Sequence, residues 1–190
     1  HRSRLARIAD DDSAAGTLAR AVLTSDAAFL LLADTPLVED ILLPRIAQEN
    51  AEARAMRSIL VTFANITPEV TKVARDAILR GVVDVLPGSG FAPKIASGIL
   101  RPALASIRGD NPGRWGISEA DVAWALREAS LKIRAGTLNV LAQWTNTYEE
   151  GGEAAWETMV SPFFDRIWPK ELRFVDEGLN RDLMALAVGA

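Results

Sequence analysis

The sequence predicts an all-α protein. Apolar residues recur at helical spacing along most of the chain, and pairs such as Thr67–Pro68 mark helix starts. The strand signal is limited to one short stretch, 81–86, which has no second strand to pair with. We expect about eight or nine helices, arranged as antiparallel helical hairpins that stack as a HEAT-like solenoid or form an irregular bundle.

Three segments of the first half begin with residues that favour a helix start. These segments are 35–47, 50–63 and 67–86. Thr35 and Thr67 are the predicted N-caps of the first and third, and each is followed by a proline, whose missing N–H has no cost at the first helical position. Asn50 is the predicted N-cap of the second.

The second half is interrupted by two stretches rich in glycine and proline, 86–91 and 108–116. Around them we expect helices at about 92–108, 118–146 and 152–168. Pro102 predicts a kink or a boundary in the first, Ser118 caps the second, and Pro169 ends the third. A last amphipathic segment begins near Asp176. We expect one helical domain over 1–190, with a subdivision possible near 87–92, and expect it to be a fragment of a longer protein.

The residue types exclude several catalytic chemistries. The chain has no cysteine, and its one histidine is His1, so internal Cys–His or Ser–His–Asp catalysis and His-ligated metal sites are not expected. Acidic residues gather at 9–13 and 148–153, beside turn residues, which favours solvated helix ends over a carboxylate or Mg²⁺ site. The glycines of 87–94 lack the spacing of a phosphate-binding loop and indicate a plain loop between helices, with phosphate at the next helix start as the alternative.

Basic residues are concentrated in one part of a chain whose net charge is −4. The candidate polyanion contacts are Lys94, Arg101, Arg108 and Arg114. Arg101 and Arg108 are seven residues apart and share a helix face. Trp115 is the one aromatic residue nearby that could stack on a base. The stripe therefore indicates a solvated or protein-contacting face first, and a nucleic-acid backbone contact second.

Aromatic residues are dense in 163–174, FFDRIWPKELRF. We interpret this stretch as a structural knuckle between packed helices, formed by Phe163, Phe164, Trp168 and Pro169. The alternative is a pocket for an apolar small molecule, completed by Trp156. Trp144 lies on the apolar stripe of 118–146 and is predicted to be in the core, whereas Trp124 lies off it and faces either a second helix or a partner.

Two stretches of the second half carry a resemblance to known proteins. REASLKIRAGTLNVLAQW, with Arg134, and AWETMVSPFFDRIWPKELRFVDEGLNRDLMALA, with Trp156 and the knuckle, resemble the helical C-terminal regions of some large prokaryotic proteins linked to antiphage defence. LVEDILLPRIAQENAEARAM (37–56) is similar to an earlier unit of such regions. Some of these proteins carry a sirtuin-like NAD-hydrolysing domain at the other end. The resemblance implies a sensor, scaffold or oligomerisation segment, with any catalytic domain outside this chain.

These observations lead to one functional expectation and two alternatives. We expect a non-catalytic, cytoplasmic helical-repeat domain that binds a protein partner or itself and needs no cofactor. The alternatives are a sequence-independent nucleic-acid binder and a helical bundle that encloses an apolar ligand. We expect no transmembrane segment, because no apolar run approaches the length needed to span a bilayer.

Overall fold

The computed structural model describes residues 4–85, 90–107, 114–147 and 152–171. All regular structure in these ranges is helical, so the all-α prediction is confirmed. The elements are α1 (Arg4–Ala9), α2 (Ala14–Ser25), α3 (Ala27–Ala33), α4 (Thr35–Leu37), η1 (Val38–Leu42), α5 (Leu43–Ile46), α6 (Ala51–Phe63), α7 (Pro68–Asp84), α8 (Ala92–Ile107), α9 (Glu119–Glu128), α10 (Leu131–Thr147), α11 (Gly152–Ala155), η2 (Trp156–Val160) and α12 (Ser161–Ile167).

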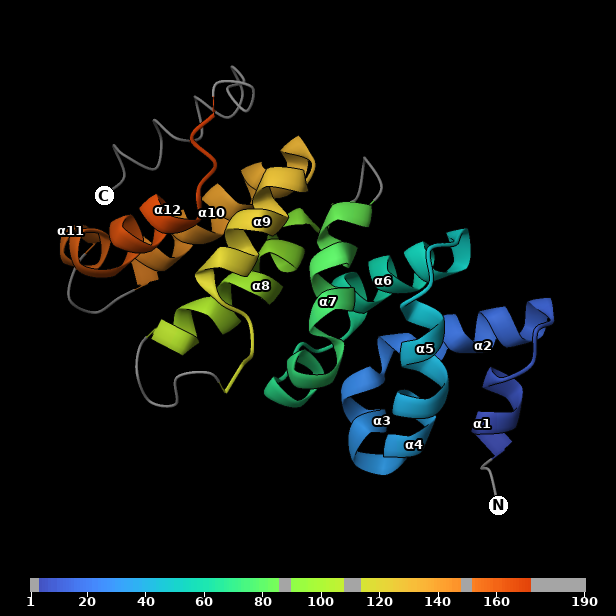
Figure 1. The fold of residues 1–190 in the computed structure, drawn as a ribbon. Helices are drawn as coiled ribbons and strands as arrows, with labels where there is room; N and C mark the ends of the chain where they lie inside the picture. The colour runs from blue at the N-terminus through green and yellow to red at the C-terminus, as the bar shows by residue number, and fades with distance from the viewer. Residues whose placement is uncertain (1–3, 86–89, 108–113, 148–151, 172–190) are drawn as a thin grey trace.

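The helices follow one another across the molecule in nearly the order of the chain (Figure 1). Helix α2 packs on α6, α6 on α7, α8 on α10, and α9 on α12. The result is an elongated helical array in which elements pack on others that are adjacent or a few positions away in the chain order. No single described helix meets the length and apolarity needed to cross a bilayer; α2 and α3 do so only as a pair, which is bent by 89°.

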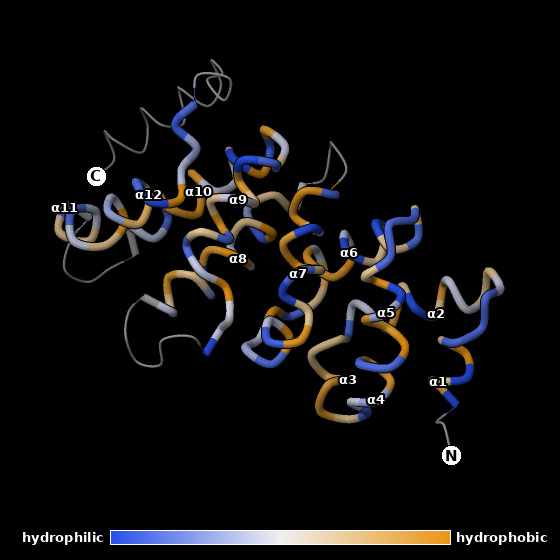
Figure 2. Tube along the Cα trace, in the orientation of Figure 1, coloured by the Kyte–Doolittle hydropathy of each residue, from blue (hydrophilic) through white to orange (hydrophobic). Residues whose placement is uncertain are grey.

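Two apolar clusters lie inside the array. The larger extends from α3 to α12 and includes residues on both sides of 87–92, such as Val82 and Ile95. The smaller joins α1 to η1, α5 and α6, with Leu42 and Met56 near its centre. Figure 2 shows the corresponding alternation of apolar and polar residues along the helices. Burial of these amphipathic faces is the main term that stabilises helices of this length.

Three of the four predicted helix caps are confirmed. Asn50, Thr67 and Ser118 each accept a hydrogen bond from the backbone N–H three residues later. The prediction for Thr35 is wrong, because the preceding residue, Asp34, takes the cap position and accepts a bond from the Leu37 N–H. The carboxylate of an aspartate serves as well as a threonine hydroxyl at an N-cap, so the pattern alone did not separate them.

The predicted long helix over 118–146 is wrong. The chain breaks into α9 and α10 because Ala129 is extended, with φ −69° and ψ 158°. Its apolar stripe nevertheless stays continuous across the break, since Leu126, Ala129 and Ile133 are all buried. The Arg134 guanidinium at the start of α10 donates to the Leu126 carbonyl at 3.4 Å and ties the two helices together.

Prolines inside helices do not end them. Helix α8 continues through Pro102 to Ile107, so Pro102 is not a boundary. Pro44 and Pro162 each follow a π-helical turn, closed by i→i−5 bonds at Leu43 and Ser161. A proline removes one N–H and crowds the preceding turn, and the wider π turn directly before it is where the helix accommodates this.

Arg20 anchors the first helical hairpin of the array. Its side chain is 1% exposed, although it carries a charge. One guanidinium nitrogen donates to the carbonyls of Ala9 and Asp11, both at 2.7 Å, at the end of α1. Nε donates to Glu52 at 2.6 Å, on the neighbouring helix α6. These bonds satisfy the buried charge and the last carbonyls of α1 together.

Arg57 repeats this arrangement in the second hairpin. It donates to the carbonyls of Ile46 and Gln48 at 2.9 and 2.8 Å, which lie 11 and 9 residues earlier, as Ala9 and Asp11 do from Arg20. Nε again donates to an acid on the next helix, here Asp84 at 2.5 Å. The two arginines therefore hold their hairpins through the same set of contacts.

The aromatic stretch lies at the end of the last described helix. Phe163 and Ile167 are fully buried in the larger cluster. Phe164 stacks on Trp168 with 5.1 Å between ring centroids, and both are partly buried against the same cluster. Trp168 is extended, so α12 ends one residue before it and the chain turns at Pro169. The predicted segment near Asp176 lies outside the described residues.

Candidate functional site

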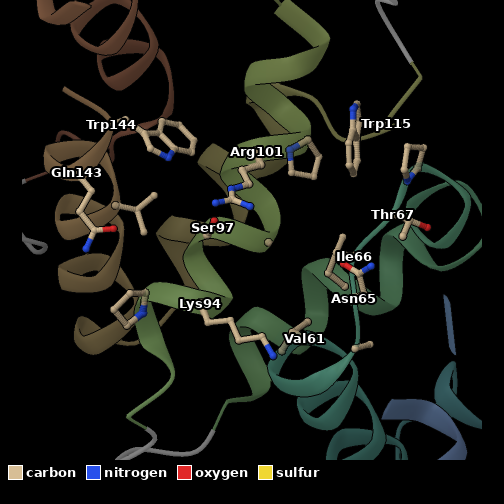
Figure 3. Close-up of a pocket in the computed structure, with 16 residues that line it drawn as sticks. Val61, Asn65, Ile66, Thr67, Lys94, Ser97, Arg101, Trp115, Gln143 and Trp144 are labelled. Atoms are coloured by element: carbon tan, nitrogen blue, oxygen red, sulfur yellow. The ribbon is translucent and has the colours of Figure 1, made fainter. Parts of the chain in front are cut away.

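A groove of about 610 Å³ lies where the connection between α6 and α7 faces α8 and α10. Its lining includes both polar and apolar side chains from four parts of the chain, and Figure 3 shows them around the central helix α8. Two of the predicted polyanion contacts, Lys94 and Arg101, belong to this lining. We refer to this site as the groove.

The floor of the groove is one face of α8. Lys94, Ser97, Gly98 and Arg101 succeed one another at the spacing of a single helix face, and all four line the groove. Small residues occupy the middle of this face, and a cation stands at each end. Seven residues of helix place the two Cα atoms roughly 10 Å apart along the axis.

The walls bring two indole rings to the same place. Trp115, from the turn before α9, and Trp144, on α10, lie on opposite sides of Arg101 (Figure 3). Asn65, Thr67 and Gln143 add amide and hydroxyl groups along the rim. The arrangement offers flat apolar faces beside a guanidinium, which can stack on planar groups and bind carboxylate or phosphate oxygens in a bidentate manner.

The positive charge of the groove is not neutralised locally. Among the described residues, its lining contains no aspartate or glutamate. Within the described ranges, Arg101 makes no ion pair and no hydrogen bond through its side chain, and it is exposed. The Lys94 ammonium lies 6.0 Å from the centre of the Phe63 ring, a cation–π contact that positions the charge without cancelling it. Both cations are therefore open to an anion.

A second cavity gives a contrast. It has about 490 Å³, lies between α5 and α7, and is lined by the cations Arg57, Lys72, Arg75 and Arg80 together with Asp76. There the three guanidiniums are paired: Arg57 with Asp84, Arg75 with Asp76 and Asp121, and Arg80 with Glu49. An incoming anion would have to displace these carboxylates, so this cavity is the weaker candidate.

The structure does not place the other two predicted basic residues, Arg108 and Arg114, in the lining of the groove. Arg114 is exposed and lies outside the lining, near Glu69 at the start of α7. The pKa of Glu69 is lowered by a hydrogen bond from its own N–H, by the Thr67 hydroxyl and, to a smaller extent, by the Arg114 charge. Arg114 thus has an acid nearby, unlike Arg101. Arg108 lies outside the described residues.

Sequence reasoning missed the contribution of Trp144. Its place on the apolar stripe predicted a core residue, and it does pack against the larger apolar cluster, but it is only partly buried and also lines the groove. The missing information was the break at Ala129, which sets how α10 lies against α8. Trp124, the other ambiguous tryptophan, is 43% exposed.

The acidic stretches take simpler roles in the described residues. Asp11 accepts the Ser13 N–H at 2.8 Å, which lowers the pKa of its carboxyl, and Asp12 pairs with Arg45 at 2.7 Å. No group of three metal-ligating side chains gathers within the described ranges. Most of the 148–153 stretch is outside them.

The whole chain is similar to one long curated protein. It shares 29% identity over 188 residues with the uncharacterized protein y4cA of Sinorhizobium fredii (strain NBRC 101917 / NGR234). The match covers 98% of this chain but 16% of that relative, so the chain spans about a sixth of the relative's length. No family model matches the chain. No solved structure matches it either. The comparison therefore gives a distant relative of much greater length and assigns no family.

Proposed function

We propose that this chain is a non-catalytic helical-repeat domain that binds an acidic segment of a protein partner in the groove. The partner is another protein or a second copy of this chain. One observation carries the proposal: two cations, Lys94 and Arg101, stand in a concave lining whose described residues include no acid. In a chain with a net charge of −4, such a locally positive groove selects anionic partners and steers their approach.

The spacing of the two cations favours an extended peptide. They are roughly 10 Å apart along α8, and one three-residue turn of a polyproline II segment covers about 9 Å. Side chains at every third position of such a segment lie on one side, so carboxylates there would reach both cations at once. The amide and hydroxyl groups of Asn65, Thr67 and Gln143 on the rim are of the kind that bond a peptide backbone.

Fluorescence anisotropy with a labelled peptide of repeated Glu-Gly-Ser units tests this proposal. Arg101→Gln should weaken binding about tenfold, because it removes a charge-assisted contact while keeping the side chain polar. Lys132→Gln is the matched control, since Lys132 is exposed on α10 and outside the groove. Equal affinities of these two variants, or no binding by the unaltered chain at low salt, would reject the proposal.

A nucleic-acid backbone is the second candidate, and the two tryptophans favour it. Trp115 and Trp144 flank Arg101, so bases could stack beside a phosphate contact. A single-stranded dT20 probe in the same assay decides between the two. Binding of dT20 that falls steeply with salt, is lost in Arg101→Gln and exceeds that of the acidic peptide would favour this candidate.

The larger context follows from the resemblance and from the relative's length. We infer that the domain is a sensing, scaffolding or oligomerisation segment of a larger prokaryotic protein linked to defence. The distant relative supports this in one respect, since the matched region is a small part of a long protein. Deletion of this segment from the full-length protein should abolish partner recruitment while leaving any activity of its other domains measurable in vitro.

A further inference from the structure

A third cavity lies beside the Lys94 end of the groove. It has about 410 Å³ and lies between α2 and α6, lined by Ala21, Val22, Ser25, Asp26, Ile59 and Phe63. Two large apolar side chains of this lining are more than half exposed, Val22 at 56% and Phe63 at 54%. Exposed apolar surface gathered in a concavity is typical of a contact for another apolar group. We refer to this site as the α2–α6 cavity.

Phe63 connects this cavity to the groove. Its ring lines the α2–α6 cavity, while the ammonium of Lys94, a lining residue of the groove, lies over the same ring at 6.0 Å. Phe91 packs edge-on against Phe63 with 5.4 Å between centroids, and it is itself 44% exposed. The cationic surface of the groove therefore lies beside the apolar surface of the α2–α6 cavity, and the Phe63–Phe91 pair lies where the two meet.

The two surfaces differ in the chemistry that they accept. In the described part of the chain, the groove is lined by two cations and no acid, whereas the α2–α6 cavity is lined by one acid, Asp26, and no cation. A carboxylate or phosphate is attracted to the first and repelled by the second, and an apolar side chain gains most in the second. A ligand with negative charge along its whole length would therefore bind the groove and leave the α2–α6 cavity unused.

We infer that the segment bound by this domain is bipartite: carboxylates that contact Lys94 and Arg101, and, at one end of them, a large apolar side chain that enters the α2–α6 cavity. This inference rests on the proposed function and adds an apolar element to the bound segment.

Three labelled peptides test the inference on the intact chain. The first is the Glu-Gly-Ser repeat, the second adds Phe at its N-terminal end, and the third adds Phe at its C-terminal end. One of the two Phe peptides should bind about tenfold more tightly than the plain repeat, and the other should not, because the apolar cavity lies at one end of the groove only.

Variants separate the two contributions. Val22→Ser should remove the advantage of the tighter Phe peptide and leave the affinity of the plain repeat nearly unchanged. Phe63→Ser should remove the same advantage and also weaken the plain repeat, because the Phe63 ring positions the Lys94 ammonium. Both side chains are more than half exposed, so folding should be retained. Leu131→Ser, at an exposed apolar position on α10, is the matched control and should change neither affinity. Arg101→Gln should weaken all three peptides by the same factor.

The outcomes distinguish this inference from the proposed function. Equal binding of the three peptides, with all of it sensitive to Arg101→Gln, would overturn the bipartite segment and keep the acidic one. A Phe advantage that survives both serine variants would also overturn it, since the apolar contact would then lie elsewhere. Tighter binding of dT20 than of any peptide would overturn both.

Discussion

At the residue scale, Arg57 is a charged side chain buried among polar partners. The side chain is 2% exposed, and it donates to two backbone carbonyls and to the Asp84 carboxylate. Glu49, the second acid near it, is mostly exposed and 3.9 Å away. A buried charge of this kind is tolerated because every donor direction has a partner, and removing it leaves those partners without one.

Arg57→Ala should therefore destabilise the chain by about 3–5 kcal/mol, the usual cost of breaking a buried ion pair. Arg54→Ala is the control on the same helix, and it should cost less than about 0.5 kcal/mol because Arg54 is exposed. Urea unfolding followed by circular dichroism measures both. A cost below about 1 kcal/mol for Arg57→Ala would mean that the buried arginine is not what joins the second hairpin.

Asp121 makes a pH-dependent contribution to the free energy of unfolding. Burial alone would raise its pKa, but hydrogen bonds from the Ser118 N–H and hydroxyl and from Arg75 outweigh this and lower the pKa below its usual 3.8. A carboxyl with a lowered folded pKa stabilises the protein while it is ionised. That contribution is complete above the unfolded pKa and is lost as the pH falls through the folded pKa.

Asp121→Asn should accordingly cost about 1 kcal/mol at pH 7, through a weaker cap and the lost ion pair with Arg75. The difference from the unaltered chain should shrink as the pH falls below about 4. Unfolding free energies at pH 7 and pH 3 measure this. Glu128→Gln, at an exposed position of the same helix, should show neither effect, and a pH-independent cost for Asp121→Asn would contradict the assignment.

At the element scale, one glycine sets how closely α10 approaches α8, the helix that forms the groove floor. A Cβ atom at Gly136 would lie 2.7 Å from the Ala92 carbonyl carbon and 2.9 Å from the Pro93 nitrogen, closer than side chains and backbone approach. Gly98, on the groove face of α8, has room instead, since its Cβ would lie 3.5 Å from an Ile66 side-chain carbon.

The two glycines should therefore respond in opposite directions. Gly136→Ala should cost about 1–3 kcal/mol, because the backbone of α8 must move. Gly98→Ala should stabilise by up to about 1 kcal/mol, as removal of a glycine from a helix interior does. Thermal and urea unfolding of the two variants measure these changes in the free energy of unfolding. Equal changes would show that α8 and α10 are not in contact at Gly136.

Local patterns predicted the elements better than their junctions. Asn50, Thr67 and Ser118 were predictable as caps because the N-cap bond is made within one turn. The break at Ala129 was not, because the apolar period continues through it and only packing against α8 and α12 distinguishes one helix from two. The same limit explains the site: Lys94 and Arg101 were found from charge, but Trp144 joins them only through that packing.

At the scale of the whole molecule, the array has two apolar clusters and not one. The smaller joins α1 to η1, α5 and α6, and the larger extends from α3 to α12. In an array whose elements contact mainly their neighbours, stability is close to a sum of local terms, and one end can open while the other stays folded. The α1–α2 hairpin is linked to the rest through Arg20 and its bond to Glu52.

Arg20→Ala should therefore unfold one end of the array before the rest. Amide protection in α1 and α2 should fall about a hundredfold, as expected when a buried charge loses its partners, while protection in α8 and α10 stays within a small factor of its original value. Phe163→Ala is the control from the opposite end, because Phe163 is fully buried against the larger cluster, and it should lower protection in α9 and α12 while sparing α1. Hydrogen exchange followed by mass spectrometry resolves these helices separately. If either variant lowered protection evenly from α1 to α12, the chain would unfold as a single unit, and the groove would then depend on the N-terminal hairpin as much as on α8.

With the expected result, the groove persists in Arg20→Ala while the α2–α6 cavity is lost, so the same variant should still bind an acidic peptide but no longer prefer one that carries Phe.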